Sequence, residues 1–588
     1  MKSFRHIFLE AENKIAGIAA APGIVIGKAY LYTKEKINVN SGEITDVAEA
    51  KNNLHEALKK SKKELNKILA IAREKMGDER AAIFEAQIMI LDDPVLIENI
   101  IKRIETERKQ PEFIVDDEIS KYQDLMMISH ETYMKERAHD IEDIKNRIIR
   151  NLQNKRWQSK IKHDVVVVSD SLTPADTILL SRSNVQGFVT DHGGLTSHAA
   201  IVSRSLNIPA VVGTHNATLH IKEDDTIIVD GFHGYALVNP NEEQINFFNL
   251  KLEKLKQIQK ELEELKDKPA VTTDGRKITL QANVDVTGEI DIVITSGAEG
   301  IGLYRTEQIL EELGEFPSEE EQTRIYTNLS SRIYPEIFTI RVFDIGGDKF
   351  KLLDYREPNP FLGLRGIRLL LENKGIFRTQ IRAILKASVN KNIQVMLPMI
   401  STIKEIRQAK ELIEDCKHEL KKEKIHFDKD MKLGIMIEVP SAALLSKEFA
   451  QEVDFLSIGT NDLIQYLMAV DRGNDLVAEL FQEFSPSVVR TIYHVVSEAK
   501  KSNKSVSLCG EMAADTLAIP LLVGLGLESL SMSPSTIAYA KRIIRSCSIK
   551  NLNKLAEDCL VCVTQEEIIE RIEKFFKDNS ITRTRNIL

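Results

Sequence analysis

The feature that most constrains the fold is a repeating pattern between about residue 275 and the C-terminus. Eight short apolar runs occur there, and each is followed by a stretch with helical periodicity. The runs read ITLQANVD, GIGLYRTE, TIRVFDIGG, IQVMLPMI, LGIMIEVP, FLSIGTND, VSLCGEM and LESLSMS. Eight strand–helix repeats over this length predict a (β/α)8 barrel.

Polar side chains collect at the C-terminal ends of these runs. In a (β/α)8 barrel the active site is built at this end, so these residues are candidates for chemistry. Ordinary surface loops would account for one or two of them, but not for polar residues on so many strands at once. The candidates are Asn283, Arg305, Glu307, Asp344, Lys349, Glu438, Asn461, Asp462, Cys509 and Glu511.

The residue types at this end predict an anion site. Guanidinium groups bind phosphate and carboxylate groups through paired hydrogen bonds. Glu438 and Asp462 offer hard oxygen ligands that can hold Mg²⁺ together with substrate oxygens. The thiol of Cys509 could deliver or remove a proton. No nucleophile is obvious among these residues. The candidate arginines are Arg305, Arg341 and Arg472, with Arg365 in NPFLGLRGIR as a possible fourth.

A second constrained stretch is residues 191–213, DHGGLTSHAAIVSRSLNIPAVVG. Its glycine pair predicts a tight bend, and Thr196 or Ser197 can cap a short helix whose first turn contains His198. Free N–H groups and the helix dipole favour an anion at such a place, so a phosphorylated imidazole would suit it. The alternative is a structural histidine packed on a sheet, and this stretch alone does not decide between them.

The rest of the chain divides into segments that differ in their residue pattern. Residues 13–43 and 156–239 alternate short strands, turns and helices, which predicts one α/β domain. Residues 44–155 interrupt it with a charged insertion of about four helices. That insertion is either a structural bundle or a docking surface for another protein. One long charged helix at 240–268 is expected to connect to the barrel, residues 269–588.

Bulk properties exclude several classes of protein. The formal charge of −9 argues against nucleic acid as the main partner. No apolar run approaches the length of a transmembrane helix, so we expect no membrane insertion. The N-terminus has neither the long apolar core nor the small-residue cleavage site of a signal peptide. The odd number of cysteines, five, does not suggest a disulfide framework. These features together predict a cytoplasmic protein.

From about Ala16 to its end, the chain resembles Enzyme I of the bacterial phosphoenolpyruvate-dependent sugar phosphotransferase system. GGLTSHAAIVSRSLNIPAVVG looks like the phosphohistidine segment of that family. GIGLYRTE, FDIGGDK, NPFLGLRGIR, MIEVPSA, GTNDLIQY, DRGN and LCGEMA look like its barrel signature, in the same order. The resemblance implies a swivelling phosphohistidine α/β domain interrupted by a four-helix HPr-binding subdomain. A connector helix and a C-terminal TIM barrel that forms a homodimer would follow.

The resemblance also implies roles for individual residues. Phosphoenolpyruvate would phosphorylate His198, which would pass the phosphoryl group to the phosphocarrier HPr. Cys509 would protonate the enolate to give pyruvate, and Glu438 and Asp462 would bind Mg²⁺. The expected substrate-binding residues are Arg305, Arg341, Lys349, Arg365, Asn461, Asp462 and Arg472.

Two positions near the histidine depart from the family pattern. Many members carry arginine where this chain has Leu195, and a small residue where it has His192. The loss of a cation there would alter the transfer rate or the stability of the phosphohistidine. Residues 1–12 precede the usual start of the family and have no assigned role.

Two other functions stay open at this point. Pyruvate phosphate dikinase and phosphoenolpyruvate synthase share the histidine domain and the barrel, but they add a large ATP-binding domain that we do not expect here. A non-catalytic regulator that keeps the fold and binds partners is the second alternative. The presence of His198, Glu438, Asp462 and Cys509 together speaks against it. The sequence does not indicate which carrier or which sugars lie downstream.

Overall fold

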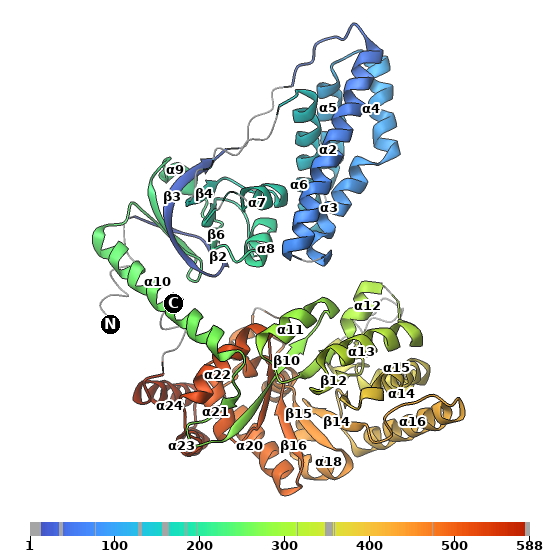
Figure 1. Ribbon diagram of the computed structural model, residues 1–588, viewed down its shortest axis with the longest axis vertical. Coiled ribbons are helices and arrows are strands. Elements are labelled where there is room, and N and C mark those ends of the chain that lie inside the picture. The colour runs from blue at the N-terminus through green and yellow to red at the C-terminus, as the bar shows by residue number, and fades with distance from the viewer. Residues whose placement is uncertain are drawn as a thin grey trace. The chain divides into compact units, whose positions relative to one another are not determined.

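The computed structural model forms two compact units that divide between Glu253 and Lys254, and each is described by itself. Figure 1 labels many of the elements of both units. The residues that the structure describes are 13–33, 39–76, 78–127, 132–155, 161, 164–181, 183, 185–195, 197–313, 315–346, 357, 359–472, 474 and 476–581.

The N-terminal unit contains an eight-stranded mixed sheet in the order β1-β8-β7-β3-β4-β5-β6-β2. Strand β3 pairs in parallel with β4 and antiparallel with β7, so strands from before and after the helical insertion form one sheet. This confirms the predicted interrupted domain. The strands are β1 (Lys14–Ala16), β2 (Ile18–Ala21), β3 (Ile24–Tyr32), β4 (Val165–Ser169), β5 (Gly187–Thr190), β6 (Ala210–Val212), β7 (Thr226–Asp230) and β8 (Tyr235–Val238).

Helices pack on both faces of this sheet because the valines of β4 alternate between them. Val165 and Val167 share a core cluster with Ala199 and Ala200, so they pack under the helix that begins at His198. Val166 and Val168 share the opposite cluster with residues of α9. The helices are α7 (Pro174–Ser181), α8 (His198–Ser205) and α9 (Ala217–His220).

The insertion between β3 and β4 has five helices among its described residues, where the sequence predicted about four. Pro94 and Pro111 each occupy the first position of a helix, where the missing N–H is not needed, and each therefore starts a new one. Gly77, between α2 and α3, lies outside the described residues. The helices are α2 (Val47–Met76), α3 (Asp78–Leu91), α4 (Pro94–Glu107), α5 (Pro111–Met127) and α6 (Thr132–Leu152).

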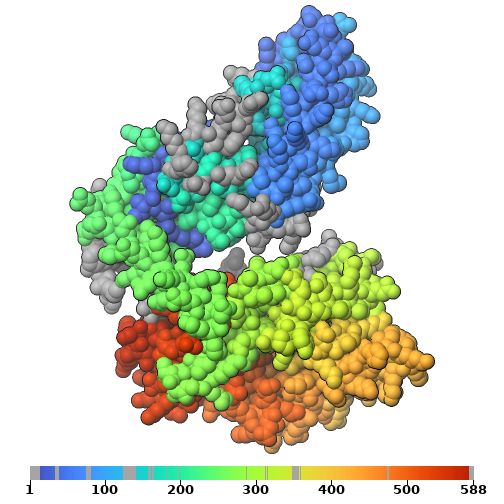
Figure 2. All heavy atoms as spheres, in the orientation of Figure 1, coloured from blue at the N-terminus to red at the C-terminus, as the bar shows by residue number. Residues whose placement is uncertain are grey.

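The helical insertion packs against one face of the α/β domain. Its core includes buried Leu54, Leu65 and Ile148, and the same cluster takes in Ile178 of α7 and Val202 of α8. The remaining surfaces of the long helices face outward, and Figure 2 shows the atoms of α2–α4 in blue as a continuous outer surface. The insertion therefore offers a large exposed area next to the domain that carries His198.

The long helix predicted between the domains is α10 (Glu242–Leu265), and the boundary of the two units falls inside it. In its C-terminal half, Ile258 and Leu262 pack against Ala538 and Tyr539. This half therefore belongs to the C-terminal unit.

The C-terminal unit is a closed barrel of eight parallel strands. The strand β10 pairs in parallel with both β11 and β17, which closes the ring, and a short β9 (Ala270–Val271) adds antiparallel to β10. All eight predicted runs form these strands, so the predicted barrel is confirmed. The strands are β10 (Lys277–Val284), β11 (Ile301–Arg305), β12 (Phe338–Arg341), β13 (Ile393–Leu397), β14 (Lys432–Ile437), β15 (Phe455–Ile458), β16 (Ser505–Leu508) and β17 (Ser529–Met532).

Helices surround the strands and bury the large core of the barrel, while the polar loops stay at the strand ends. None of the described helices combines the length and apolar character needed to span a membrane. The domain boundaries at residues 43, 155, 239 and 268 stay predictions. The helices are α11 (Ile290–Ser296), α12 (Glu307–Leu313), α13 (Glu319–Ile333), α14 (Ile367–Glu372), α15 (Lys374–Ala387), α16 (Ile403–Lys422), α17 (Pro440–Leu444), α18 (Ser446–Glu452), α19 (Thr460–Met468), α20 (Pro486–Lys501), α21 (Ala518–Gly524), α22 (Ile537–Arg545), α23 (Ile549–Leu560) and α24 (Gln565–Asp578).

Candidate active site

A cavity of about 420 Å³ opens at the C-terminal ends of the barrel strands. Predicted site residues supply much of its lining, and each lies at the end of a strand or in a following loop. Lys349 is outside the described residues, and no histidine is among the described residues that line the cavity. The predicted residues that the cavity brings together are Arg305, Glu307, Arg341, Asp344, Arg365, Glu438, Asn461, Asp462, Arg472, Cys509 and Glu511.

Three carboxylates form a cluster in this cavity. One oxygen from each of Asp344, Glu438 and Asp462 lies within 4.8 Å of the others. Hard oxygen donors at this spacing fit a small divalent cation, which prefers carboxylates together with substrate or water oxygens. The sequence predicted Glu438 and Asp462 as ligands, and the structure adds Asp344 as a third candidate.

Glu438 is buried close to the other two carboxylates of the cluster. The side chain is only 1% exposed, and its Oε1 accepts a hydrogen bond from the backbone N–H of Met399 at 2.5 Å. Burial, and after it the charges of Asp462 and Asp344, raise the pKa of the Glu438 carboxyl to about 8. A cation beside the cluster would relieve this repulsion, so the residues fit a metal ion.

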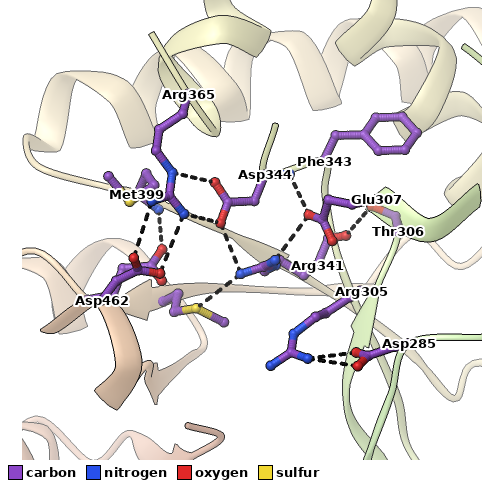
Figure 3. A network of polar contacts seen from close by, with 12 residues as sticks. Asp285, Arg305, Thr306, Glu307, Arg341, Phe343, Asp344, Arg365, Met399 and Asp462 are labelled. Carbon is purple, nitrogen blue, oxygen red and sulfur yellow. Dashed lines mark hydrogen bonds and ion pairs between the residues drawn. The ribbon is translucent and has the colours of Figure 1, made fainter. Parts of the chain in front are cut away.

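Arg341, the last residue of β12, is held among acidic groups. Its Nη2 donates to Glu307 Oε1 at 3.1 Å, and its Nη1 lies 3.1 Å from Asp344 Oδ2 (Figure 3). Burial opposes its charge, but these two carboxylates keep the pKa of Arg341 above its usual value. Its buried Nε has no hydrogen-bond partner among the described residues, which leaves a donor for a bound anion.

Arg365 lies between two carboxylates of the cluster (Figure 3). Its Nε and Nη2 donate to Asp344 Oδ1 and Oδ2 at 3.2 and 2.8 Å. Its Nη1 and Nη2 donate to Asp462 Oδ1 and Oδ2 at 3.2 and 3.4 Å. The remaining N–H of Nη1 donates to Tyr466 Oη at 3.3 Å. All five guanidinium N–H groups thus have protein partners.

Two further arginines pair with carboxylates of the cavity lining. Arg305 Nη1 donates to both oxygens of Asp285, at 2.8 and 2.9 Å. Arg472 Nη1 lies 3.5 Å from Glu511 Oε1, and Glu511 also exchanges two hydrogen bonds with Asn461. These pairs orient the cations before any ligand binds.

The charge balance of the lining is negative. Four arginines face six carboxylates among the described residues. An anionic substrate would therefore need additional positive charge in the cavity, which a divalent cation can supply. The carboxylates are Asp285, Glu307, Asp344, Glu438, Asp462 and Glu511.

Cys509 follows β16 and is 1% exposed. Ser457 Oγ donates to its Sγ at 3.3 Å, and the thiol itself points to the carbonyl of Ile458 at 3.7 Å. Burial raises the pKa of the Cys509 thiol, so it carries a proton at neutral pH. A protonated thiol in an anion-binding cavity suits a proton donor.

In the N-terminal unit, α8 begins at His198 as predicted. Ser197 is its N-cap, with extended backbone and an Oγ that accepts from the N–H of Ala200 at 3.4 Å. Gly193 has φ 122° in the preceding bend, a conformation that favours glycine. The backbone of His198 is described, but its side chain and Thr196 lie outside the described residues.

The two departures from the family pattern lie in this bend. The Nδ1 of His192 lies 3.1 Å from Asp170 Oδ1, and both side chains are exposed. The carbonyl of Leu195 accepts a hydrogen bond from Arg204 Nη2 at 2.5 Å. Arg204, in the last turn of α8, thus brings a guanidinium back to the bend.

Two contacts of the site were not predicted from the sequence. Asp285 lines the cavity and accepts from Arg305, but in the sequence it is only the last residue of ITLQANVD. Tyr466, in the second turn of α19, contacts Arg365, and nothing in the sequence indicated that contact. Glu307 was predicted as a strand-end residue, but its pairing with Arg341 was not.

Known proteins match most of the chain. Models of PEP-utilising enzymes match in order: the N-terminal domain at residues 16–137, the mobile domain at 161–234 and the PEP-binding domain at 259–549. Phosphoenolpyruvate-protein phosphotransferase of Staphylococcus carnosus (strain TM300) is 42% identical over 570 residues, covering 96% of this chain and 100% of that protein. The chain belongs to the phosphoenolpyruvate-protein phosphotransferase family.

Other members of this phosphotransferase family are similar to the same extent. The protein of that name from Listeria innocua serovar 6a is 41% identical and covers 96% of this chain and 99% of its own length. An NMR solution structure of Enzyme I is 42% identical in sequence over 41% of this chain and 99% of its own, with a TM-score of 0.37. The predicted family is confirmed by the curated relatives.

The charge on Glu438 gives a testable pH dependence of stability. Because the folded state raises its pKa to about 8, ionisation favours the unfolded chain as pH rises from the ordinary value of 4.5 toward 8. We expect Glu438→Gln to stabilise the protein in chelator at pH 8 by on the order of 4 kcal/mol, and little at pH 5. Thermal unfolding at both pH values measures this, and a gain that is equal at both would contradict it.

Proposed function

We propose that this chain, in the cytoplasm, transfers the phosphoryl group of phosphoenolpyruvate to His198 and then to the histidine of the carrier HPr. Pyruvate is released, and the reaction is the first step of sugar uptake by the phosphotransferase system. One observation carries this proposal. The cavity of the matched PEP-binding domain combines four arginines, a three-carboxylate cluster and a protonated thiol.

The arginines bind the anionic groups of phosphoenolpyruvate. Guanidinium forks match phosphate and carboxylate oxygens, and the unpartnered Nε of Arg341 is a ready donor. The amide of Asn461 adds a neutral hydrogen-bond donor at the rim. The proposed substrate-binding residues are Arg305, Arg341, Lys349, Arg365, Asn461, Asp462 and Arg472.

Mg²⁺ is the proposed cofactor, with Glu438 and Asp462 as its ligands and Asp344 as a third. When bound, it would offset the negative charge of the substrate oxygens. The fit rests on the spacing of the three carboxylates and on the repulsion that raises the pKa of Glu438.

The proposed chemistry has two parts. The P–O bond to the enol oxygen breaks as a neutral imidazole nitrogen of His198 forms a P–N bond. The electron pair left on the enolate becomes the carbonyl of pyruvate as C3 takes a proton from Cys509 Sγ. The thiolate then recovers a proton from solvent. Burial, which keeps the thiol protonated, supports this role.

Transfer requires His198, in the N-terminal unit, to reach the cavity of the barrel and then the carrier. We assign this movement to the α/β domain on the connector α10, since the unit boundary falls inside that helix. Conformational steps of this kind limit turnover in many enzymes.

The helical insertion is the proposed docking site for HPr. Met89 and Val95 lie on either side of the turn between α3 and α4 and are 74% and 61% exposed. We assign these two exposed apolar side chains to the contact with HPr. The insertion also packs directly on α8, which begins at His198.

We propose that the barrels dimerise through the face around α20. That helix packs against α17, α18 and α23, and exposed apolar side chains surround it. A double variant Leu444→Asp/Leu476→Asp should sediment as a monomer where the wild type sediments as a dimer. Leu219→Asp in the other unit, at a position 81% exposed, is the control. A double variant that stays dimeric would contradict the assignment. The apolar residues are Leu444, Leu445, Leu476, Leu480, Tyr493, Val561 and Val563.

Phosphoryl transfer to His198 is tested by labelling. Incubation with ³²P-phosphoenolpyruvate and Mg²⁺ should give one acid-labile, base-stable label per chain, because phosphoimidazoles have this stability pattern. His198→Ala should take no label, whereas His192→Ala, six residues away in the same loop region, should still be labelled. Label on the His198→Ala variant would refute the proposal.

The role of Cys509 predicts a separable defect. Cys509→Ala should lower the rate of pyruvate formation by about 10²-fold or more, because it removes the proton donor but no charged ligand. Calorimetric titration should show phosphoenolpyruvate affinity close to that of the wild type. Cys416→Ala, which changes a buried cysteine away from the cavity, is the control. A wild-type rate in Cys509→Ala would exclude this role.

A further inference from the structure

The hydrogen bonds of Arg365 have a consequence for metal binding. Its guanidinium uses both oxygens of Asp344 and both oxygens of Asp462. Those two carboxylates are two of the three that form the candidate metal cluster. A cation that binds Asp344 and Asp462 must therefore use oxygens to which Arg365 donates.

We propose that Arg365 is an internal competitor of the metal ion, and that metal binding releases its N–H groups to the phosphoryl group of the substrate. This inference rests on the proposed function, because it takes the metal and the substrate from there. A divalent cation among the carboxylates repels the guanidinium and removes its acceptors. An anionic substrate offers the freed guanidinium new acceptors of the same bidentate geometry.

The exchange makes metal and substrate bind with positive coupling. Without the metal, Arg365 has no N–H group to offer, since its fifth donor is taken by Tyr466 Oη. With the metal, the substrate stabilises the displaced guanidinium and so strengthens metal binding in return. By linkage, each ligand must raise the affinity of the other by the same factor.

Tyr466 holds Arg365 in the competing position. Its Oη accepts from Arg365 Nη1 and donates to the carbonyl of Phe361 at 2.5 Å. The ring of Phe361 lies 5.9 Å from the guanidinium carbon, close enough for a cation–π contact. Tyr466 is therefore a positioning residue: it connects the loop that contains Phe361 to Arg365.

Mn²⁺ binding, followed by the loss of the free-ion EPR signal, tests this without turnover. In the absence of phosphoenolpyruvate, Arg365→Gln should bind Mn²⁺ about 10-fold more tightly than the wild type, because a competing positive charge is gone. Tyr466→Phe should bind it two- to threefold more tightly. This variant loses the hydroxyl that accepts from Arg365, and the effect is on the order of one weakened hydrogen bond. Arg368→Gln should bind Mn²⁺ like the wild type, because among the described residues that guanidinium donates only to the carbonyls of Leu362 and Gly363.

The coupling is measured in the His198→Ala background, which cannot turn over. Phosphoenolpyruvate should tighten Mn²⁺ binding there about 10-fold or more, and this gain should largely disappear when Arg365→Gln is added. Folded Arg365→Gln with unchanged or weaker Mn²⁺ affinity would overturn the inference. If that variant does not fold, unchanged Mn²⁺ affinity in Tyr466→Phe overturns it instead. A wild type that binds no Mn²⁺ at all would reject the metal part of the proposed function, which is a different failure.

Discussion

The pairing of each cavity arginine with at least one carboxylate is the interaction on which the rest of the site depends. Buried guanidinium groups are costly without a counter-ion, and the carboxylates make their burial possible. The same pairing fixes the direction of each guanidinium. It also removes the excess positive charge that an anionic substrate needs. The pairs are Arg305 with Asp285, Arg341 with Glu307 and Asp344, Arg365 with Asp344 and Asp462, and Arg472 with Glu511.

The closed parallel barrel is what makes this pairing possible. Every strand ends on the same side, so residues as distant in sequence as Asp285 and Glu511 line one cavity. In the proposed function, the barrel would supply the substrate site, a carboxylate cluster that fits a metal ion, and the proton donor. A histidine is missing from its described lining residues. His198 starts a capped helix in the other unit, so the proposed transfer would require the α/β domain to move on α10.

Much of this organisation could be predicted from the sequence because it depends on local patterns. Eight apolar runs with helical intervals indicated the barrel, and strand ends indicated most of the cavity residues, including Arg341 and Glu438. Pairings across the barrel were not predictable, because they depend on three-dimensional placement. Asp344 was seen only as a polar strand-end residue, and Tyr466 not at all, since its contact with Arg365 spans 101 positions of the chain. The number of helices in the insertion was underestimated because Pro111 was not recognised as a helix start.

The central claim is that the cavity lacks the positive charge to bind its substrate until a divalent cation joins the carboxylate cluster. Calorimetric titration of phosphoenolpyruvate into the His198→Ala variant, in Mg²⁺ and in chelator, tests it most directly. We expect at least about 10-fold tighter binding in Mg²⁺, equivalent to about 1.4 kcal/mol. Equal affinity under the two conditions would contradict it.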